Sequence, residues 1–276
     1  MTVKITTLIE NNPGEDPVLK NEHGLSFYIE KGDLKILFDT GQSRAFIDNA
    51  ERLHVDLSSL DSVVLSHGHY DHSGGFKALV EITTDFKLVV GQGFFAEKYG
   101  KKDTSYDFLG SDFDQEFLAA HNISYQFATH HLTELAPGIY VVTGFPRMHP
   151  DEVINEHFVV KREDALYPDP FDDEILLALD TSEGLLVLLG CSHPGMKNML
   201  DFTVRLLNRP LYGVLGGTHL VQVSEKTLGL SLEYLHQESL KVIGVCHCTG
   251  QLAMDSLRLS NSRFFDNTTG SILLVD

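Results

Sequence analysis

The sequence has few cysteines and few prolines. Three cysteines in 276 residues, two of them in Cys246-His247-Cys248, cannot form the disulfide framework of a small secreted protein, and they fit a reducing compartment. Only 9 prolines occur, whereas 42% of the residues are hydrophobic and 17 are Phe. This is enough apolar material for a packed core, so the composition excludes a disordered chain.

Basic charge and long apolar runs are also scarce. The chain has 21 basic residues against 39 acidic ones, and its net charge of −18 repels polyphosphate, so nucleic acid is not expected as a partner. No apolar run approaches the roughly 18 to 20 residues of a membrane span. Met1–Glu10 does not combine a basic region with an apolar core, so we expect a cytoplasmic protein without a membrane partner. Whether the protein forms a homo-oligomer is left open by the sequence.

The length is compatible with one large α/β domain spanning 1–276. Apolar patterns predict strands, and helices follow them in both halves of the chain. The segment from about 91 to 173 is richer in aromatic and charged residues, and we interpret it as an inserted or covering segment. The expected strands are 3–8, 25–30, 35–38, 61–66, 87–90, 175–180, 185–190, 211–216 and 242–246, and the expected helices are 43–53, 198–207 and 224–237.

Histidine is abundant, with 14 copies, and four of these follow predicted strands at residues 67, 193, 219 and 247. Neutral imidazole is the commonest metal ligand in proteins and a proton shuttle near pH 7. Because residues at strand ends gather along one edge of packed sheets, we expect these histidines to share a site.

The stretch His67–His72 reads HGHYDH and packs three imidazoles and a carboxylate into six residues. If the chain stays extended past Leu65, His67 and His69 project to the same side and can grip one cation. A turn at Asp71 and His72 can offer a second pair of ligands. These donors suit zinc, iron or manganese, and softer sulfur ligands could come only from the three cysteines.

This motif after a buried strand resembles the signature of the metallo-β-lactamase superfamily. Further matches are DTG at 39–41, SHGHYDHSGG at 66–75, GCSHPG at 190–195, GGTHL at 216–220 and HCTG at 247–250. Together they resemble the branch named for dihydropterin ribofuranosylaminobenzene phosphate synthase. The resemblance implies an αββα sandwich with a metal site at the sheet edges.

The resemblance also implies one or two divalent metal ions, zinc first, with iron or manganese as alternatives. The superfamily usually supplies a bridging aspartate between the last two histidine motifs, but here no Asp lies between Asp201 and Asp255. Either His219 takes that place or only one metal binds tightly. Asp39 resembles a residue that orients a ligand imidazole. The implied ligands are His67, His69 and His193 for the first metal and Asp71, His72 and His247 for the second.

Other candidates have simpler interpretations. Cys246 and Cys248 are expected to be structural, because strand alternation would place them on the opposite face from His247. His23 is expected in a surface loop, with contact to bound substrate as the alternative. Solvated side chains are expected for His121, His130, His131 and His236.

A metal pair can activate water, so hydrolysis of a small anionic substrate is the first functional hypothesis: a phosphate ester, a phosphodiester or a lactone-like molecule. Asp71 would be a ligand and proton acceptor, and His219 could protonate a leaving group. The alternative is a transferase that joins a pterin precursor to an aminobenzene-type phosphate. A di-iron oxidoreductase and a non-catalytic metal sensor have less support. Stacking aromatics near the metals would favour the transferase, and the candidates are Phe94, Phe95, Tyr106 and Phe145.

Overall fold

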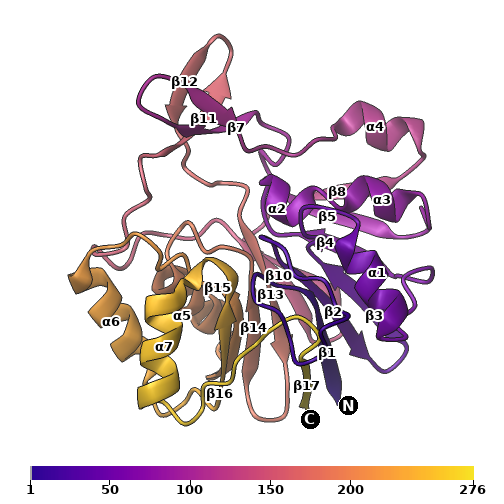
Figure 1. Ribbon diagram of the computed structural model, residues 1–276. Helices are drawn as coiled ribbons and strands as arrows, with labels where there is room; N and C mark the ends of the chain where they lie inside the picture. Colours follow the sequence, from indigo (N-terminus) through magenta and orange to yellow (C-terminus); the bar gives the residue numbers. More distant parts are fainter. Residues whose placement is uncertain (1) are drawn as a thin grey trace. The chain divides into compact units, whose positions relative to one another are not determined.

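The computed structural model describes residues 2–276, which divide into two compact units (Figure 1). The first unit comprises residues 2–127, Asn155–Asp173 and Thr268–Val275. The second comprises Ala128–Ile154, Glu174–Asn267 and Asp276. Among the described residues, no helix is both long enough and apolar enough to cross a membrane.

The first unit contains a seven-stranded mixed sheet. Strands β1, β2 and β3 pair antiparallel, and β3, β4 and β5 pair parallel. Lys31 pairs with Leu34, so β2 and β3 are joined by a hairpin turn at Gly32-Asp33. In spatial order the strands are β17 (Ile272–Val275), β1 (Val3–Ile9), β2 (Ser26–Lys31), β3 (Leu34–Phe38), β4 (Ser62–Leu65), β5 (Lys87–Gly91) and β8 (Ser124–Ala128).

Short helices and a small second sheet complete the first unit. The helices are α1 (Ala45–Arg52), α2 (Tyr70–Ser73), α3 (Phe76–Val80) and α4 (Gln115–Ala120). Apolar residues of α1 and α3, such as Phe46 and Phe76, form one buried cluster with Val63 and Leu65 of β4. The small sheet orders β12 (Ala165–Pro168), β11 (Phe158–Arg162), β6 (Lys98–Lys101) and β7 (Tyr106–Phe108).

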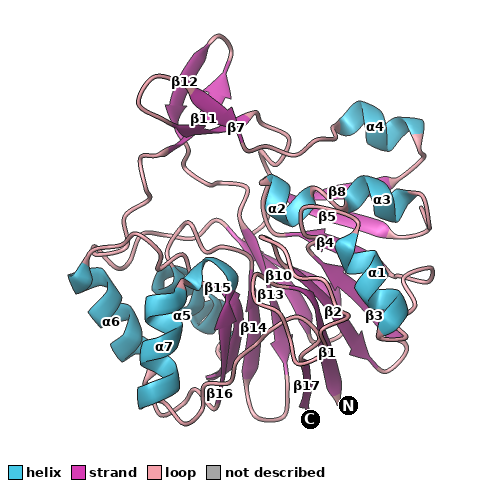
Figure 2. Ribbon diagram, in the orientation of Figure 1, coloured by secondary structure: helices cyan, strands magenta, loops and turns pink. Residues whose placement is uncertain are grey.

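The second unit contains a six-stranded sheet with helices α5, α6 and α7 along one face (Figure 2). Strands β14, β15 and β16 pair parallel, whereas β13 pairs antiparallel with both β10 and β14. The strands are β16 (Val242–Cys246), β15 (Leu211–Gly217), β14 (Leu185–Leu189), β13 (Ile175–Asp180), β10 (Ile139–Thr143) and β9 (Leu132–Ala136). The helices are α5 (Met196–Leu207), α6 (Glu225–Leu235), the 3-10 turn η1 (His247–Thr249) and α7 (Gln251–Ser260).

Continuous apolar runs explain how this sheet is buried. All five residues of β14 are buried, as are Ile175–Leu179 of β13, and such continuous apolar runs are typical of a sheet covered on both faces. Val187 belongs to one buried cluster with Met199 of α5, Leu235 of α6 and Leu257 of α7. The predicted strands and helices are therefore confirmed to within a few residues.

Residues 91–173 contribute to both units. They form the small sheet, α4 and most of β8 in the first unit and β9 and β10 in the second. Their assignment as a covering segment stays a prediction.

A buried ion cluster links the small sheet to the loop that follows it. Lys98 of β6 is 2% exposed, and its Nζ lies 2.7 Å from Asp169 Oδ2 and 2.9 Å from Asp173 Oδ1. Burial alone would lower the pKa of Lys98, but the two carboxylates outweigh it and raise that pKa above its usual value. The ammonium therefore stays charged and compensates two buried acids.

We expect Lys98→Met to lower the free energy of unfolding by about 3–5 kcal/mol near pH 7, because it leaves Asp169 and Asp173 buried without their cation. Urea denaturation of the metal-free protein measures the change. The matched control is Lys161→Met, which removes an exposed pair with Glu97 and should have little effect. Equal effects of the two substitutions would contradict this account of the cluster.

Candidate metal centre

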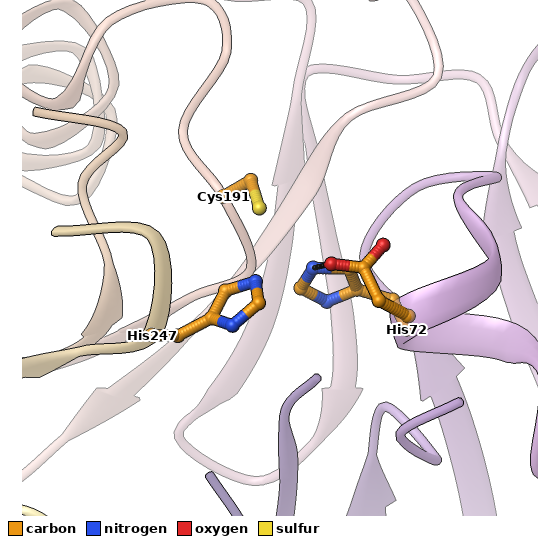
Figure 3. A group of neighbouring side chains, drawn as sticks. His72, Cys191 and His247 are labelled. Carbon is orange, nitrogen blue, oxygen red and sulfur yellow. Dashed lines mark ion pairs between the residues drawn. The ribbon is translucent and has the colours of Figure 1, made fainter. Parts of the chain in front are cut away.

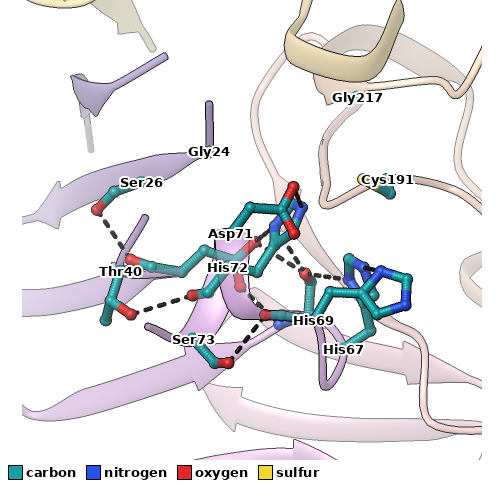
Figure 4. A network of polar contacts seen from close by, with 12 residues as sticks. Gly24, Ser26, Thr40, His67, His69, Asp71, His72, Ser73, Cys191 and Gly217 are labelled. Carbon is teal, nitrogen blue, oxygen red and sulfur yellow. Dashed lines mark hydrogen bonds and ion pairs between the residues drawn. The ribbon is translucent and has the colours of Figure 1, made fainter. Parts of the chain in front are cut away.

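The first group of histidines follows β4 directly. The side chains of His67 and His72 are fully buried, and His69 is 5% exposed. His67 Nε2 lies 3.0 Å from His69 Nδ1, and the rings of His67 and His72 are 4.3 Å apart (Figure 4). The chain bends after β4 and enters α2 at Tyr70, which brings the three imidazoles together. The sequence-predicted cluster therefore exists within the first unit.

Asp39 orients this cluster from the turn after β3. It is fully buried, and its Oδ2 lies 2.7 Å from His72 Nδ1. The same carboxylate accepts hydrogen bonds from the backbone amide and the hydroxyl of Ser66, at 2.7 and 2.8 Å. The contact that the sequence indicated for Asp39 is present. It leaves His72 Nε2 as the ring nitrogen that can bind a metal.

Asp71 lies at the start of α2 with its side chain 8% exposed. Its Oδ2 lies 3.6 Å from His72 Nε2 and 3.2 Å from His23 Nε2. His23 is half exposed, as expected for a loop, but its contact with Asp71 was not predicted. The local sequence around His23 contains no signal for this contact, because it depends on loops that are far apart in the chain.

Glycine and a buried acid fix the backbone between the first two ligands. A Cβ on Gly68 would lie 2.2 Å from the carbonyl oxygen of Phe94, so no larger residue fits. The amide of Gly68 donates a 2.8 Å hydrogen bond to Asp173, the same residue that pairs with Lys98. The ion cluster thus holds the loop that carries His67 and His69.

The protonation state of His67 favours metal binding. Burial, together with the neighbouring His72 and His69, holds the pKa of His67 well below its usual value. The neutral imidazole that results is the form that coordinates metals.

The second group of candidates belongs to the second unit and follows three adjacent parallel strands. His193 comes after β14, His219 after β15 and His247 directly after β16. Parallel strands end at the same sheet edge, and accordingly the rings of His193 and His219 are 4.4 Å apart. His219 and His247 have φ values of 47° and 55°, a strained backbone that is concentrated at functional sites.

Glu174 anchors the loop of His193. It is fully buried, and its two carboxylate oxygens accept hydrogen bonds from the amides of Ser192 and His193, at 2.5 and 3.1 Å. Glu174 directly follows Asp173, so two consecutive acids each hold one ligand-bearing loop in their own unit. Neither acid was singled out from the sequence, where they look like part of an ordinary acidic turn.

Cys248 does not follow the strand alternation expected from the sequence. Cys248 Sγ, Cys191 Sγ and a ring nitrogen of His219 all lie within 4.8 Å of one another. Strand alternation fails here because β16 ends at Cys246 and η1 begins at His247, which turns Cys248 toward the other donors. The alternation on which the structural interpretation of Cys248 was based therefore does not hold, and that interpretation stays a prediction. Cys191 also lies beside His247 (Figure 3).

The thiol of Cys248 has an unusual environment. Burial alone would raise its pKa, but a hydrogen bond with Cys191 and the nearby His247 and His219 hold that pKa well below its usual value. A thiolate is the form of cysteine that binds metals.

Two aromatic rings that the sequence did not single out surround His69. Phe158 and Phe171 have ring centroids 5.4 and 5.5 Å from the imidazole. Among the aromatic candidates, Phe94 is fully buried and Phe95 packs against the same apolar core. Tyr106 is 48% exposed on β7. Phe145 packs against the apolar core of the second unit.

Comparison with known proteins identifies the family. The model of the metallo-β-lactamase superfamily matches residues 20–195, which is more than half of the chain. The chain belongs to the metallo-β-lactamase superfamily. The matched range includes Asp39, the HGHYDH motif and His193.

Relatives of known name fall within this superfamily. The chain is 28% identical to the 7,8-dihydropterin-6-methyl-4-(β-D-ribofuranosyl)-aminobenzene-5′-phosphate synthase of Methanocaldococcus jannaschii, over 90% of this chain and 88% of that protein. It is 26% identical to a metal-dependent hydrolase of the β-lactamase superfamily whose crystal structure matches 98% of both chains with a TM-score of 0.85. A diphosphatase structure, 15% identical with a TM-score of 0.59, shares the fold. The predicted α/β sandwich fold of this superfamily is confirmed.

The donors fit the divalent metals that the superfamily usually binds. The first unit offers buried imidazoles and one carboxylate, and the second offers imidazoles and thiols. Imidazole and carboxylate suit zinc, iron and manganese, and thiolates add a preference for zinc.

Because Asp39 holds the ring of the candidate ligand His72, we expect Asp39→Asn to weaken metal binding by about 10–100-fold. The amide cannot hold the His72 Nδ1–H and the Ser66 donors as the carboxylate does. Competition with a chromogenic chelator measures the affinity. Asp16→Asn, in an exposed loop, is the control. Unchanged affinity in the Asp39 variant would contradict the orienting role.

Proposed function

We propose that this protein is a metal-dependent hydrolase that acts on a small anionic substrate. The observation that carries the proposal is the buried cluster of His67, His69 and His72, held in one orientation by Asp39. Imidazole is the commonest metal ligand among side chains, so three of them buried together favour a bound cation. The similarity to a metal-dependent hydrolase over 98% of the chain supports the same conclusion.

We further propose the ligand set that the motifs of the superfamily imply. His67, His69 and His193 would hold the first ion, and Asp71, His72 and His247 the second. This assignment rests on the motifs of the superfamily and on the geometry within each unit. Zinc is proposed first, with iron or manganese as alternatives.

When bound, such ions lower the pKa of a coordinated water toward neutrality and polarise a substrate oxygen. The chain's own residues supply positioning and proton transfer. Asp71 would accept a proton from the nucleophilic water, and its contact with His23 keeps that carboxylate in place. His219 would either donate a proton to the leaving group or serve as a further ligand.

The charge of the protein favours a small substrate. A net charge of −18 repels large polyanions, whereas metal cations attract a compact anion at the site. Phosphate monoesters, phosphodiesters and lactone-like molecules are the proposed classes.

A transferase is the second candidate. It is favoured by the 28% identity to a synthase that is named for a pterin linked to a ribofuranosyl-aminobenzene phosphate. Phe158 beside His69 offers a ring on which a flat aromatic substrate could stack. Two incubations of the metal-loaded protein separate hydrolysis from transfer. One contains chromogenic esters alone, and the other contains a pterin precursor plus an aminobenzene phosphate.

Removal of His69 tests the hydrolase. We expect His69→Ala to lose metal and to reduce hydrolysis of chromogenic phosphate esters to background, because a ligand is missing. Elemental analysis and initial rates measure this, and the unfolding midpoint of the metal-free protein should change little. His130→Ala, on an exposed loop, should leave metal content and rate unchanged. Full turnover of the His69 variant at normal metal content would refute the proposal.

The role of His219 is tested by His219→Asn. As a proton donor, its loss should reduce kcat by roughly 10²–10⁴-fold at unchanged metal content. As a ligand, its loss should remove one ion per chain. Metal analysis beside steady-state rates separates the two roles, and a variant with normal rate and normal metal content would exclude both.

A further inference from the structure

Cys191 lies at the centre of the donor atoms of the second unit. Its Sγ is within 4.8 Å of a ring nitrogen of His193, of His219 and of His247. The same limit holds for its distance from Cys248 Sγ. These four neighbours come from three different loops, so the thiol is the one group that all of them share.

These separations are close enough for the thiol to share a metal with its neighbours after small side-chain movements. With metal–nitrogen bonds of about 2.0 Å and metal–sulfur bonds of about 2.3 Å, two ligands on a tetrahedral ion lie roughly 3.6 Å apart. An Sγ within 4.8 Å of two different imidazoles therefore needs only small side-chain movements to share an ion with either.

Charge gives a reason for sulfur at this place. His193, His219 and His247 are neutral ligands when they bind a cation, so the imidazoles of the second unit supply no negative charge. No aspartate occurs between Asp201 and Asp255, the stretch that carries His219 and His247. A cysteine thiolate supplies the missing charge, and metal binding would release the thiol proton to solvent.

The backbone around Cys191 is fixed in advance. The carbonyl of Gly190 accepts a 3.0 Å hydrogen bond from the amide of Gly217, and the hydroxyl of Ser192 donates to the Gly217 carbonyl at 2.8 Å. Glu174 holds the amides of Ser192 and His193. Cys191 itself is 3% exposed, so its thiol is presented from a rigid loop in a site with little water.

We propose that Cys191 is a metal ligand of this protein, whose thiolate is shared between the ion held by His193 and the ion held by His247. The inference rests on the proposed metal-dependent function and assigns it a sulfur ligand. Cys246 provides the comparison within the same chain. It is buried at the end of β16 near Asn267, and it belongs to none of the donor groups among the described residues.

The first experiment uses the unaltered protein. X-ray absorption of the zinc-loaded full chain should show sulfur scattering at about 2.3 Å in addition to nitrogen and oxygen. Bound zinc with nitrogen and oxygen neighbours alone would overturn the proposal while leaving the metal-dependent function intact. If elemental analysis finds no metal bound by the unaltered protein, both the ligand assignment and the proposed function fail.

Matched variants identify which sulfur is bound. In the cobalt-substituted protein we expect a thiolate-to-metal charge-transfer band that Cys246→Ser retains and Cys191→Ser loses. The zinc affinity of Cys191→Ser should fall by more than about 100-fold. This exceeds the loss expected for a residue that only orients a ligand. A band of full intensity in Cys191→Ser would overturn the assignment. The scattering measurement needs no substitution, so it decides the question even where Cys191→Ser fails to fold.

Discussion

Three buried carboxylates hold the loops that carry the candidate metal ligands. Asp39 binds the amide and hydroxyl of Ser66 and the ring of His72, Asp173 binds the amide of Gly68, and Glu174 binds the amides of Ser192 and His193. Each acid is at most 2% exposed, so removing any one would leave buried amides unpaired. These bonds give the histidines a fixed direction before any ion binds, and preorganisation of this kind makes a polar cluster specific for a metal.

The acids can be buried because the surrounding charge is arranged for them. Lys98 forms ion pairs with both Asp169 and Asp173, and backbone amides compensate Glu174. The sheets supply the rigid support, because continuous apolar strands such as β14 end abruptly in glycine-containing turns. Core packing therefore determines where each loop begins, and the carboxylates determine how it is oriented.

Bound metal ions would offset the repulsion between this acidic protein and an anionic substrate. A chain with a net charge of −18 repels anions at long range, yet the proposed substrate is anionic. Cations held by the proposed imidazole and anionic ligands would reverse the field locally. The number of anionic ligands matters for this balance, because each one lowers the net positive charge that the substrate meets.

The sequence by itself determined the secondary structure and the local ligand motif. Apolar runs such as 185–190 and 242–246 predict buried strands, and HGHYDH places its donors within reach of one another. Tertiary structure alone decided the contacts between distant loops: His23 with Asp71, Asp173 with Gly68, Glu174 with His193, and Cys248 with Cys191. No periodicity records such pairs, because each depends on where a chain leaves its strand and on the turn it then takes. Cys248 shows the reason most directly, since a 3-10 turn at His247 replaces the strand alternation that the sequence suggested.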